Sequence, residues 1–309
     1  MPEDEKSAKG FIPQHYFLPL EESLYSLGDA ESAFFKSQTG IHDDEQLKKH
    51  IVMIQEQAFS VHPYPCIRHY AFTKLKISRI SAYDTLLNLG KQREGAIFLD
   101  IGCCFGNDVR KAVADGYPVQ NVLASDLRQG FWDLGHKLFL DTPETFPVPF
   151  IPGDAFDSSH LEVVPPFTTA TAPSGPAPDL QSLTSLNPLL GRVSAIHASS
   201  LFHLFLEERQ LHLVRALAGL LSPESGSIIF GQHGSRPVKG LRNPIVGDYA
   251  MFCHSPDSWK KLWEEEAFEK GTFKVEATLH EVQRPDLASV LPEEAGRKFY
   301  MMDWCVTRI

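Results

Sequence analysis

Several common features are missing from this chain of 309 residues. No run approaches the roughly 18 apolar residues that a membrane helix needs, and the first residues lack the apolar core of a secretion signal. The 29 Lys and Arg residues are outnumbered by 39 Asp and Glu residues, and no basic stripe of the kind that nucleic-acid binders carry is present. We therefore expect a cytoplasmic protein that binds neither membranes nor nucleic acid.

Cysteine is scarce, and its spacing is uninformative about metals. The five cysteines are odd in number and lack the paired spacings of a zinc site or a disulfide framework. A cluster of acids suited to magnesium is also missing. Reduced thiols and no bound metal are the resulting expectations.

The dinucleotide fingerprint G-x-G-x-x-G is absent as well, which disfavours a nicotinamide-dependent reductase. Residues 97–106, Ile-Phe-Leu-Asp-Ile-Gly-Cys-Cys-Phe-Gly, instead predict a buried parallel strand that ends in a tight turn at Gly102 and Gly106. Asp100 would repel a pyrophosphate but suits an ammonium group. Asp126 follows the next apolar stretch and suits a pair of ribose hydroxyls, because a carboxylate accepts both hydrogen bonds. A ligand with a ribose and an amino acid tail is S-adenosyl-L-methionine.

At these residues the chain resembles the class I S-adenosylmethionine-dependent methyltransferases. Their glycine motif aligns with Asp100, Gly102, Cys104 and Gly106, with Cys104 in place of the middle glycine, and Cys103 lies within the same turn. The resemblance implies cofactor contacts from this turn. It further implies a ribose acid and its neighbour at Asp126 and Leu127, and an adenine-side group at Asp154, Ala155 and Phe156, in which Asp154 accepts from the adenine amino group and Phe156 stacks on the ring.

The resemblance also implies the fold class, a Rossmann-like α/β fold with a mostly parallel seven-stranded sheet and helices on both faces. The expected later elements are a strand at 192–198, a helix at 201–221, a strand at 227–230 and two terminal strands at 273–282 and 298–307. We expect an N-terminal helical extension over 1–90 and the cofactor-binding domain over 91–309. A loop rich in Pro, Ser and Thr at 165–188 is either a tolerated insertion or a flap that touches substrate.

Two helices are expected within the extension. Asp43 and Asp44 offer a cap to a helix in which Leu47, Ile51, Ile54 and Ala58 recur at helical spacing. Core packing explains this stripe, and the alternative is a lid over the active site. Residues 70–89 give a second helical pattern that ends at Gly90.

Two short segments narrow the resemblance. Residues 196–205 and 62–68 are similar to a group of fungal methyltransferases that modify terpenoid, meroterpenoid and polyketide acids and phenols. This similarity implies O-methylation of a small apolar carboxylic acid or phenol, with S-adenosyl-L-homocysteine as product. Methylation of carbon or nitrogen on a similar scaffold and a catalytically silent cofactor-binding member remain alternatives. A monomer and a homodimer are both open.

Candidate catalytic residues follow the fourth strand. His203 is a candidate general base or substrate anchor, and His197 is more suited to the cofactor site than to proton transfer. Candidates for substrate binding are Tyr64, Arg68, His233, Tyr249 and Phe252.

Overall fold

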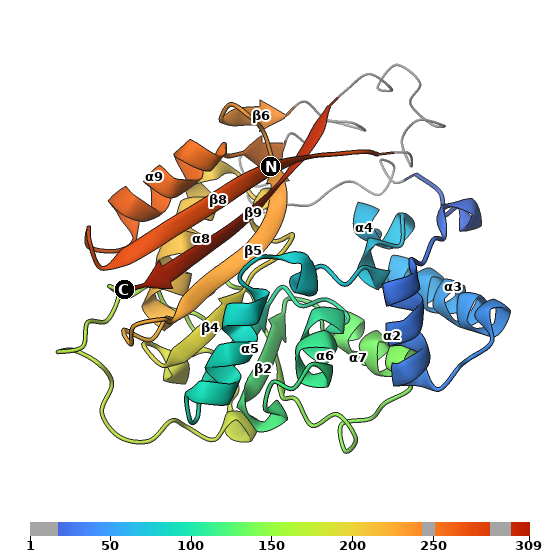
Figure 1. Cartoon of the computed structure of the whole chain (residues 1–309), viewed down its shortest axis with the longest axis horizontal. Helices are drawn as coiled ribbons and strands as arrows, with labels where there is room; N and C mark the ends of the chain where they lie inside the picture. Colours follow the sequence, from blue (N-terminus) through green and yellow to red (C-terminus); the bar gives the residue numbers. More distant parts are fainter. Residues whose placement is uncertain (1–17, 243–250, 285–297) are drawn as a thin grey trace, which may run out of the picture.

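The computed structural model describes residues 18–242, 251–284 and 298–309. Its centre is a seven-stranded sheet with the order β3-β2-β1-β4-β5-β9-β8 (Figure 1). The parallel strands are β1 (Ile97–Ile101), β2 (Val122–Asp126), β3 (Phe150–Pro152), β4 (Val193–His197) and β5 (Ile228–Ser235). The last strand, β9 (Phe299–Arg308), runs antiparallel to β5 and to β8 (Phe273–Val282). The predicted Rossmann-like fold is confirmed.

Helices cover both faces of this sheet. Their bounds are α2 (Asp29–Thr39), α3 (Asp44–Val61), α4 (Pro65–Arg68), α5 (Tyr83–Gln92), α6 (Asn107–Ala114), α7 (Gln129–Phe139), α8 (Glu207–Leu220) and α9 (Pro256–Glu266). Successive side chains of a strand point to opposite faces. Leu99 of β1 therefore belongs to one core with α8 and α9, whereas Phe98 belongs to a second core with α5 and α6. A small hairpin, β6 (Gly240–Arg242) and β7 (Met251–Cys253), follows β5.

α2 and α3, which precede β1, pack on α7. The side chain of Asp43 accepts the backbone N–H of Gln46 and caps α3, and the predicted stripe from Leu47 to Ala58 is buried. The Phe35 ring of α2 stacks on Phe139 of α7 with centroids 5.2 Å apart. The predicted core packing of α3 is confirmed. No helix among the described residues is long and apolar enough to cross a membrane.

The predicted helix at 70–89 is wrong in its first half. Tyr70 has a φ of 55°, and two short 3-10 turns, η3 (Ala71–Thr73) and η4 (Ile77–Arg79), precede α5. The N–H of Ile77 donates to the Asp108 carboxylate at 3.1 Å instead of to a helical carbonyl. α5 then passes through Gly90 and ends at Gln92.

The predicted helix at 201–221 is also interrupted. A 3-10 turn, η8 (Phe202–Leu204), comes first, Phe205 and Leu206 are extended, and α8 begins at Glu207. The carbonyl of Phe205 accepts from the Gln210 side chain, which stabilises the break. This break places His203 on η8, apart from α8.

The loop at 165–188 lies away from the carboxyl ends of the parallel strands, at the lower left of Figure 1. Arg192, before β4, donates to the carbonyls of Ser174 and Gly175, and Arg308, at the end of β9, donates to that of Phe167. Both arginines sit at the amino-end rim of the parallel strands. This placement argues against a substrate flap.

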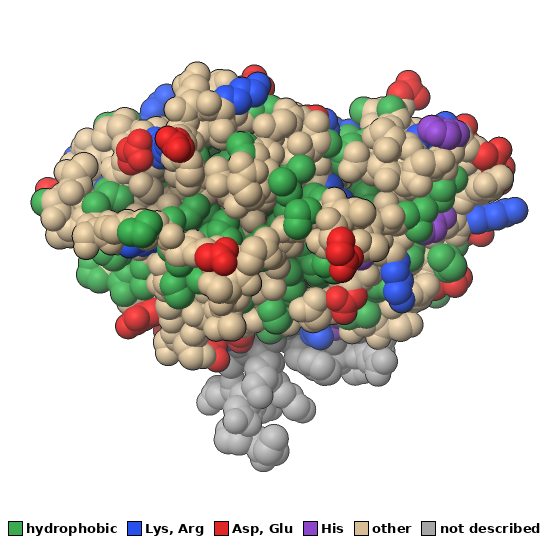
Figure 2. Space-filling view, turned by 90° about the horizontal axis from the view of Figure 1, so that it is seen from below, with side chains coloured by type: hydrophobic (Ala, Val, Ile, Leu, Met, Phe, Trp, Pro, Cys, Tyr) green, Lys and Arg blue, Asp and Glu red, His purple; other side chains and the backbone are tan. Residues whose placement is uncertain are grey.

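The face seen in Figure 2 shows hydrophobic side chains scattered between polar ones. Lys and Arg side chains stand apart from one another there, and acidic side chains lie between them.

Candidate functional site

The site begins at the turn between β1 and α6, beside the point where the strand order reverses between β1 and β4. In open α/β sheets, ligands bind outside the carboxyl ends of the strands at this point. Gly102, Cys104 and Gly106 have φ values of 75°, 51° and 68°. Cys104 therefore adopts the left-handed conformation that glycine takes readily, and the turn keeps its path despite the substitution.

We expect Gly106→Ala to destabilise the protein by about 2–4 kcal/mol. An added Cβ would lie 2.5 Å from Cζ3 of Trp132, in addition to the strain of the positive φ. Gly95→Ala is the matched control, because Gly95 has nearly the same φ of 69° but no atom within 4 Å of the added Cβ. Urea unfolding of both variants gives the two costs, and equal losses would show that the contact with Trp132 is unimportant.

Asp126, at the end of β2, holds the turn in place. Its two carboxylate oxygens accept the backbone N–H groups of Cys104 and Arg128, each at 3.0 Å. Burial raises the pKa of Asp126, while the two backbone donors act to lower it. The next side chain, Leu127, is 57% exposed and leaves apolar surface open beside the carboxylate.

Arg128 is a site residue that sequence reasoning missed. It belongs to no motif, yet its guanidinium lies near the hydroxyl of Tyr64 and acts to lower the pKa values of Tyr64 and Asp126, which burial raises. Its Nε is buried without a hydrogen-bond partner among the described residues. The structure thus brings Tyr64, from the segment before α4, next to Asp126.

Asp100 and His197 are paired across β1 and β4 in the sheet register. One Asp100 oxygen lies 2.8 Å from Nδ1 of His197, and Nε2 of His197 lies 2.7 Å from the Ser199 hydroxyl, which also accepts the N–H of Gln232. Burial acts to lower the pKa of His197, but the charge and hydrogen bond of Asp100 outweigh it and raise the pKa. The chain of bonds fixes the segment after β4, and no described residue bonds to the second Asp100 oxygen.

The adenine-side group lies on the loop after β3. Asp154 is exposed, and its carboxylate accepts the N–H of Phe156 at 3.0 Å. One face of the Phe156 ring is covered by the Arg209 guanidinium, 4.1 Å from the ring centroid, and the ring edge contacts Phe205. Ala155 packs with Phe156 against the α8 core. Stacking of Phe156 on an adenine stays a prediction, limited to its other face.

His203, on η8, is held neutral. Its Nδ1 accepts the N–H of Gly234 at 3.0 Å, which places the ring hydrogen on Nε2. Burial and the nearby charges of Arg242, Lys76 and Arg284 lower the pKa of His203 to about 3. No hydrogen bond from the described residues reaches Nε2, so this atom is a donor available to a ligand.

Three further candidate substrate residues are buried or nearly so. Arg68 is buried and bonds to Pro19 and Glu21 of the N-terminal segment, so its guanidinium is not available at the site. His233 is enclosed by Phe202, Trp259 and Trp304 and accepts the Trp304 N–H, which makes it a core residue. Phe252 is nearly buried in β7, against His254. Tyr249 lies outside the described residues.

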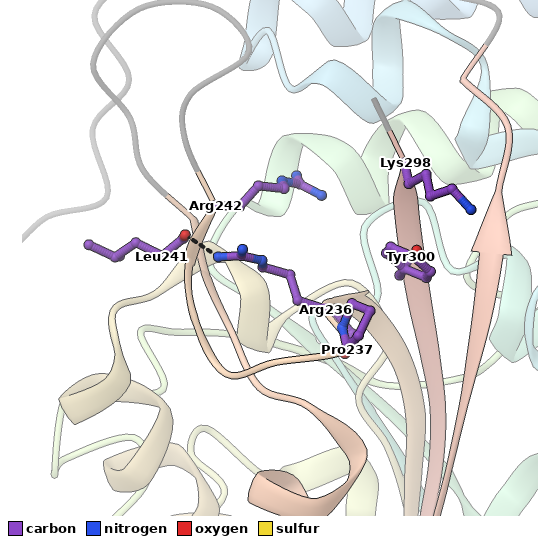
Figure 3. A pocket seen from close by; sticks show the side chains of 7 residues that line it. Arg236, Pro237, Leu241, Arg242, Lys298 and Tyr300 are labelled. Atoms are coloured by element: carbon purple, nitrogen blue, oxygen red, sulfur yellow. Dashed lines mark hydrogen bonds between the residues drawn. The ribbon is translucent and has the colours of Figure 1, made fainter. Parts of the chain in front are cut away.

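A cavity of about 350 Å³ opens where β5 ends and β9 begins (Figure 3). Three cationic side chains line it, Arg236, Arg242 and Lys298, together with Tyr300. Arg236 donates to the carbonyl of Leu241, and Lys298 pairs with Glu281. Ser235, which lines the cavity, directly follows Gly234, the residue whose N–H donates to His203. Within the described ranges, no three His, Cys, Asp or Glu side chains gather to hold a metal ion.

The chain is similar in sequence to several fungal methyltransferases. Residues 20–73 match the family described as Meroterpenoid methyltransferase N-terminal domain. O-methyltransferase atr3 of Stereocaulon alpinum is 30% identical over 90% of this chain and 72% of its own. O-methyltransferase phiE, from a fungal species, is 31% identical over 74% of this chain and 68% of its own length. The Asnovolin E/Chermesin D methyltransferase nvfJ of Aspergillus novofumigatus is 29% identical over 74% and 72%.

Among solved structures, an S-adenosylmethionine-dependent methyltransferase from Mesorhizobium loti covers 74% of this chain and 99% of its own, at 15% identity and a TM-score of 0.42. The DhpI complex with S-adenosylhomocysteine covers 85% and 97%, at 12% identity and a TM-score of 0.40. The sequence matches decide the family. The chain belongs to the fungal natural-product methyltransferases and is an S-adenosylmethionine-dependent enzyme of secondary metabolism.

Proposed function

We propose that this methyltransferase modifies an oxygen atom of a small, largely apolar acid or phenol and releases S-adenosyl-L-homocysteine. The residues at the carboxyl ends of β1 and β2 fit the cofactor. Asp126 suits the ribose hydroxyls, exposed Leu127 offers an apolar surface to the base, and the second oxygen of Asp100 suits the ammonium. Bound there, S-adenosyl-L-methionine supplies an activated methyl group.

The state of His203 favours a carboxylic acid over a phenol. A carboxylate is ionised at neutral pH and needs no base, whereas a phenol gains from one. A histidine whose pKa is lowered to about 3, and whose Nδ1 already accepts from Gly234, is a poor base. Its Nε2–H is a good donor to an acceptor oxygen. The cationic lining of the adjoining cavity supports an anionic acceptor as well.

The test is methyl transfer from labelled cofactor to matched pairs of acceptors that share one apolar scaffold and differ only in carrying a carboxyl or a phenolic hydroxyl. We expect label in the acids, and we expect mild alkali to release it, because methyl esters hydrolyse and aryl methyl ethers do not. Asp126→Asn, which impairs the proposed cofactor site, is the negative control. Alkali-stable label, with NMR placing the methyl on carbon or nitrogen, would contradict O-methylation.

A further inference from the structure

A lysine that no motif marks lies beside the glycine turn. Lys76 belongs to the segment before η4, which is tied to the first turn of α6 by two hydrogen bonds. Asn107 donates to the carbonyl of Lys74 at 3.3 Å, and Ile77 donates to Asp108 at 3.1 Å. α6 begins directly after Gly106, so this segment is held against the same turn that forms the candidate cofactor site.

The charge of Lys76 affects the pKa values of titratable groups on both sides of that turn. Burial raises the pKa values of Cys104 and Asp108, and the Lys76 ammonium acts to lower both. It also acts to lower the pKa of His197 and of His203. One ammonium therefore lies within electrostatic reach of the glycine turn, the end of β4 and the candidate acceptor anchor.

Two other cations near the turn are already bound. Arg110 of α6 pairs with Asp141 and stacks on Phe139, and Arg68 pairs with Glu21. Lys76 is partly exposed, and within the described parts of the chain its ammonium forms no hydrogen bond or ion pair. A partly exposed cation that does not pair with the nearby Asp108 carboxylate is available to a ligand anion.

We propose that Lys76 binds the carboxylate of the methionine part of the cofactor. This inference rests on the proposed cofactor site, in which Asp126 takes the ribose and the glycine turn leads from it to the amino acid end. That end carries an ammonium and a carboxylate on the same carbon atom. Asp100 and Asp108 suit the ammonium, and Lys76 supplies the opposite charge, which the carboxylate requires.

The test is isothermal titration of the full chain with three nucleosides: S-adenosylmethionine, its decarboxylated form and 5′-methylthioadenosine. We expect Lys76→Met to weaken S-adenosylmethionine binding about tenfold to a hundredfold, the range for a charged hydrogen bond. The two ligands without a carboxylate change less than about threefold. Lys76→Arg retains most of the affinity, because it keeps the charge.

Lys74→Met is the matched control, since Lys74 lies two residues away and donates to the Ser26 carbonyl at 2.6 Å. Its affinity for all three ligands should equal that of the unmodified chain. Equal losses for all three ligands in Lys76→Met, or no loss at all, would overturn the inference. If the unmodified chain binds none of the three, the proposed cofactor site itself is wrong, and the inference falls with it.

Discussion

Asp126→Asn is expected to weaken S-adenosylmethionine binding by more than about a hundredfold, the largest effect of any single change at the cofactor site. Two losses combine. The charge that would strengthen two ribose hydrogen bonds disappears. In addition, both carboxylate oxygens accept backbone N–H groups in the structure, from Cys104 and Arg128. An amide has one oxygen, so its NH₂ group would face one of these donors and displace it.

The measurement is titration with S-adenosylmethionine, accompanied by thermal unfolding to separate binding from folding. Asp133→Asn is the control, because Asp133 is an exposed acid of α7 that bonds only to the Gln129 side chain among the described residues. 5′-Methylthioadenosine extends the test. It has the ribose without the amino acid, so its affinity should fall in Asp126→Asn and persist in Lys76→Met. An Asp126→Asn protein that keeps full affinity would remove Asp126 from the ribose site.

The strands could be predicted because their local sequence is decisive. Residues 97–101 are apolar apart from one acid, as a strand buried on both faces requires, and the terminal strand at 273–282 was predicted with its observed bounds. β5 was predicted too short. Its last residues, Gln232 to Ser235, are polar or small and are strand only because they pair with β9.

The failed helix at 70–89 has a non-local cause. The N–H of Ile77 donates to the carboxylate of Asp108, 31 residues further along the chain. The backbone N–H of Leu75 likewise points to the carboxylate of Glu31, at 3.5 Å. A periodic pattern of apolar residues records which side chains are buried. It does not record that a distant carboxylate takes a backbone donor away from the helix.

The candidate site also has residues that the sequence reveals and residues that it does not. The glycine turn and Asp126 could be found because a motif fixes both residue type and spacing. Lys76 and Arg128 could not, since a single cation has no spacing, and its role depends on which acids lie nearby. Arg68 and His233 had the right chemistry for a site, but Arg68 pairs with Glu21, and His233 is enclosed in the core, where its Nδ1 accepts the Trp304 N–H. The type of a residue shows which chemistry its side chain can perform, but the fold determines whether that side chain reaches the site.

His203→Ala is expected to lower kcat/KM for a carboxylic acid acceptor about tenfold to a hundredfold, with little change in cofactor affinity. The lost interaction is the Nε2–H donor, since Nδ1 already accepts from Gly234. His203→Gln places an amide N–H near the same position and should retain more activity than His203→Ala. His280→Ala is the control, because that exposed imidazole of β8 pairs with Asp303 instead.

The pH dependence separates an anchor from a base. The pKa of His203 is lowered to about 3, so the imidazole gains a proton only below that pH and stays neutral from about pH 5 to 9. An anchor of this kind contributes no acid limb to kcat/KM in that range, and His203→Ala lowers the whole profile by one factor. An acid limb near pH 6.5 in the unmodified enzyme that vanishes in His203→Ala would identify His203 as a titrating base. Such a base would serve a phenol, so the same experiment tests whether the acceptor is an acid.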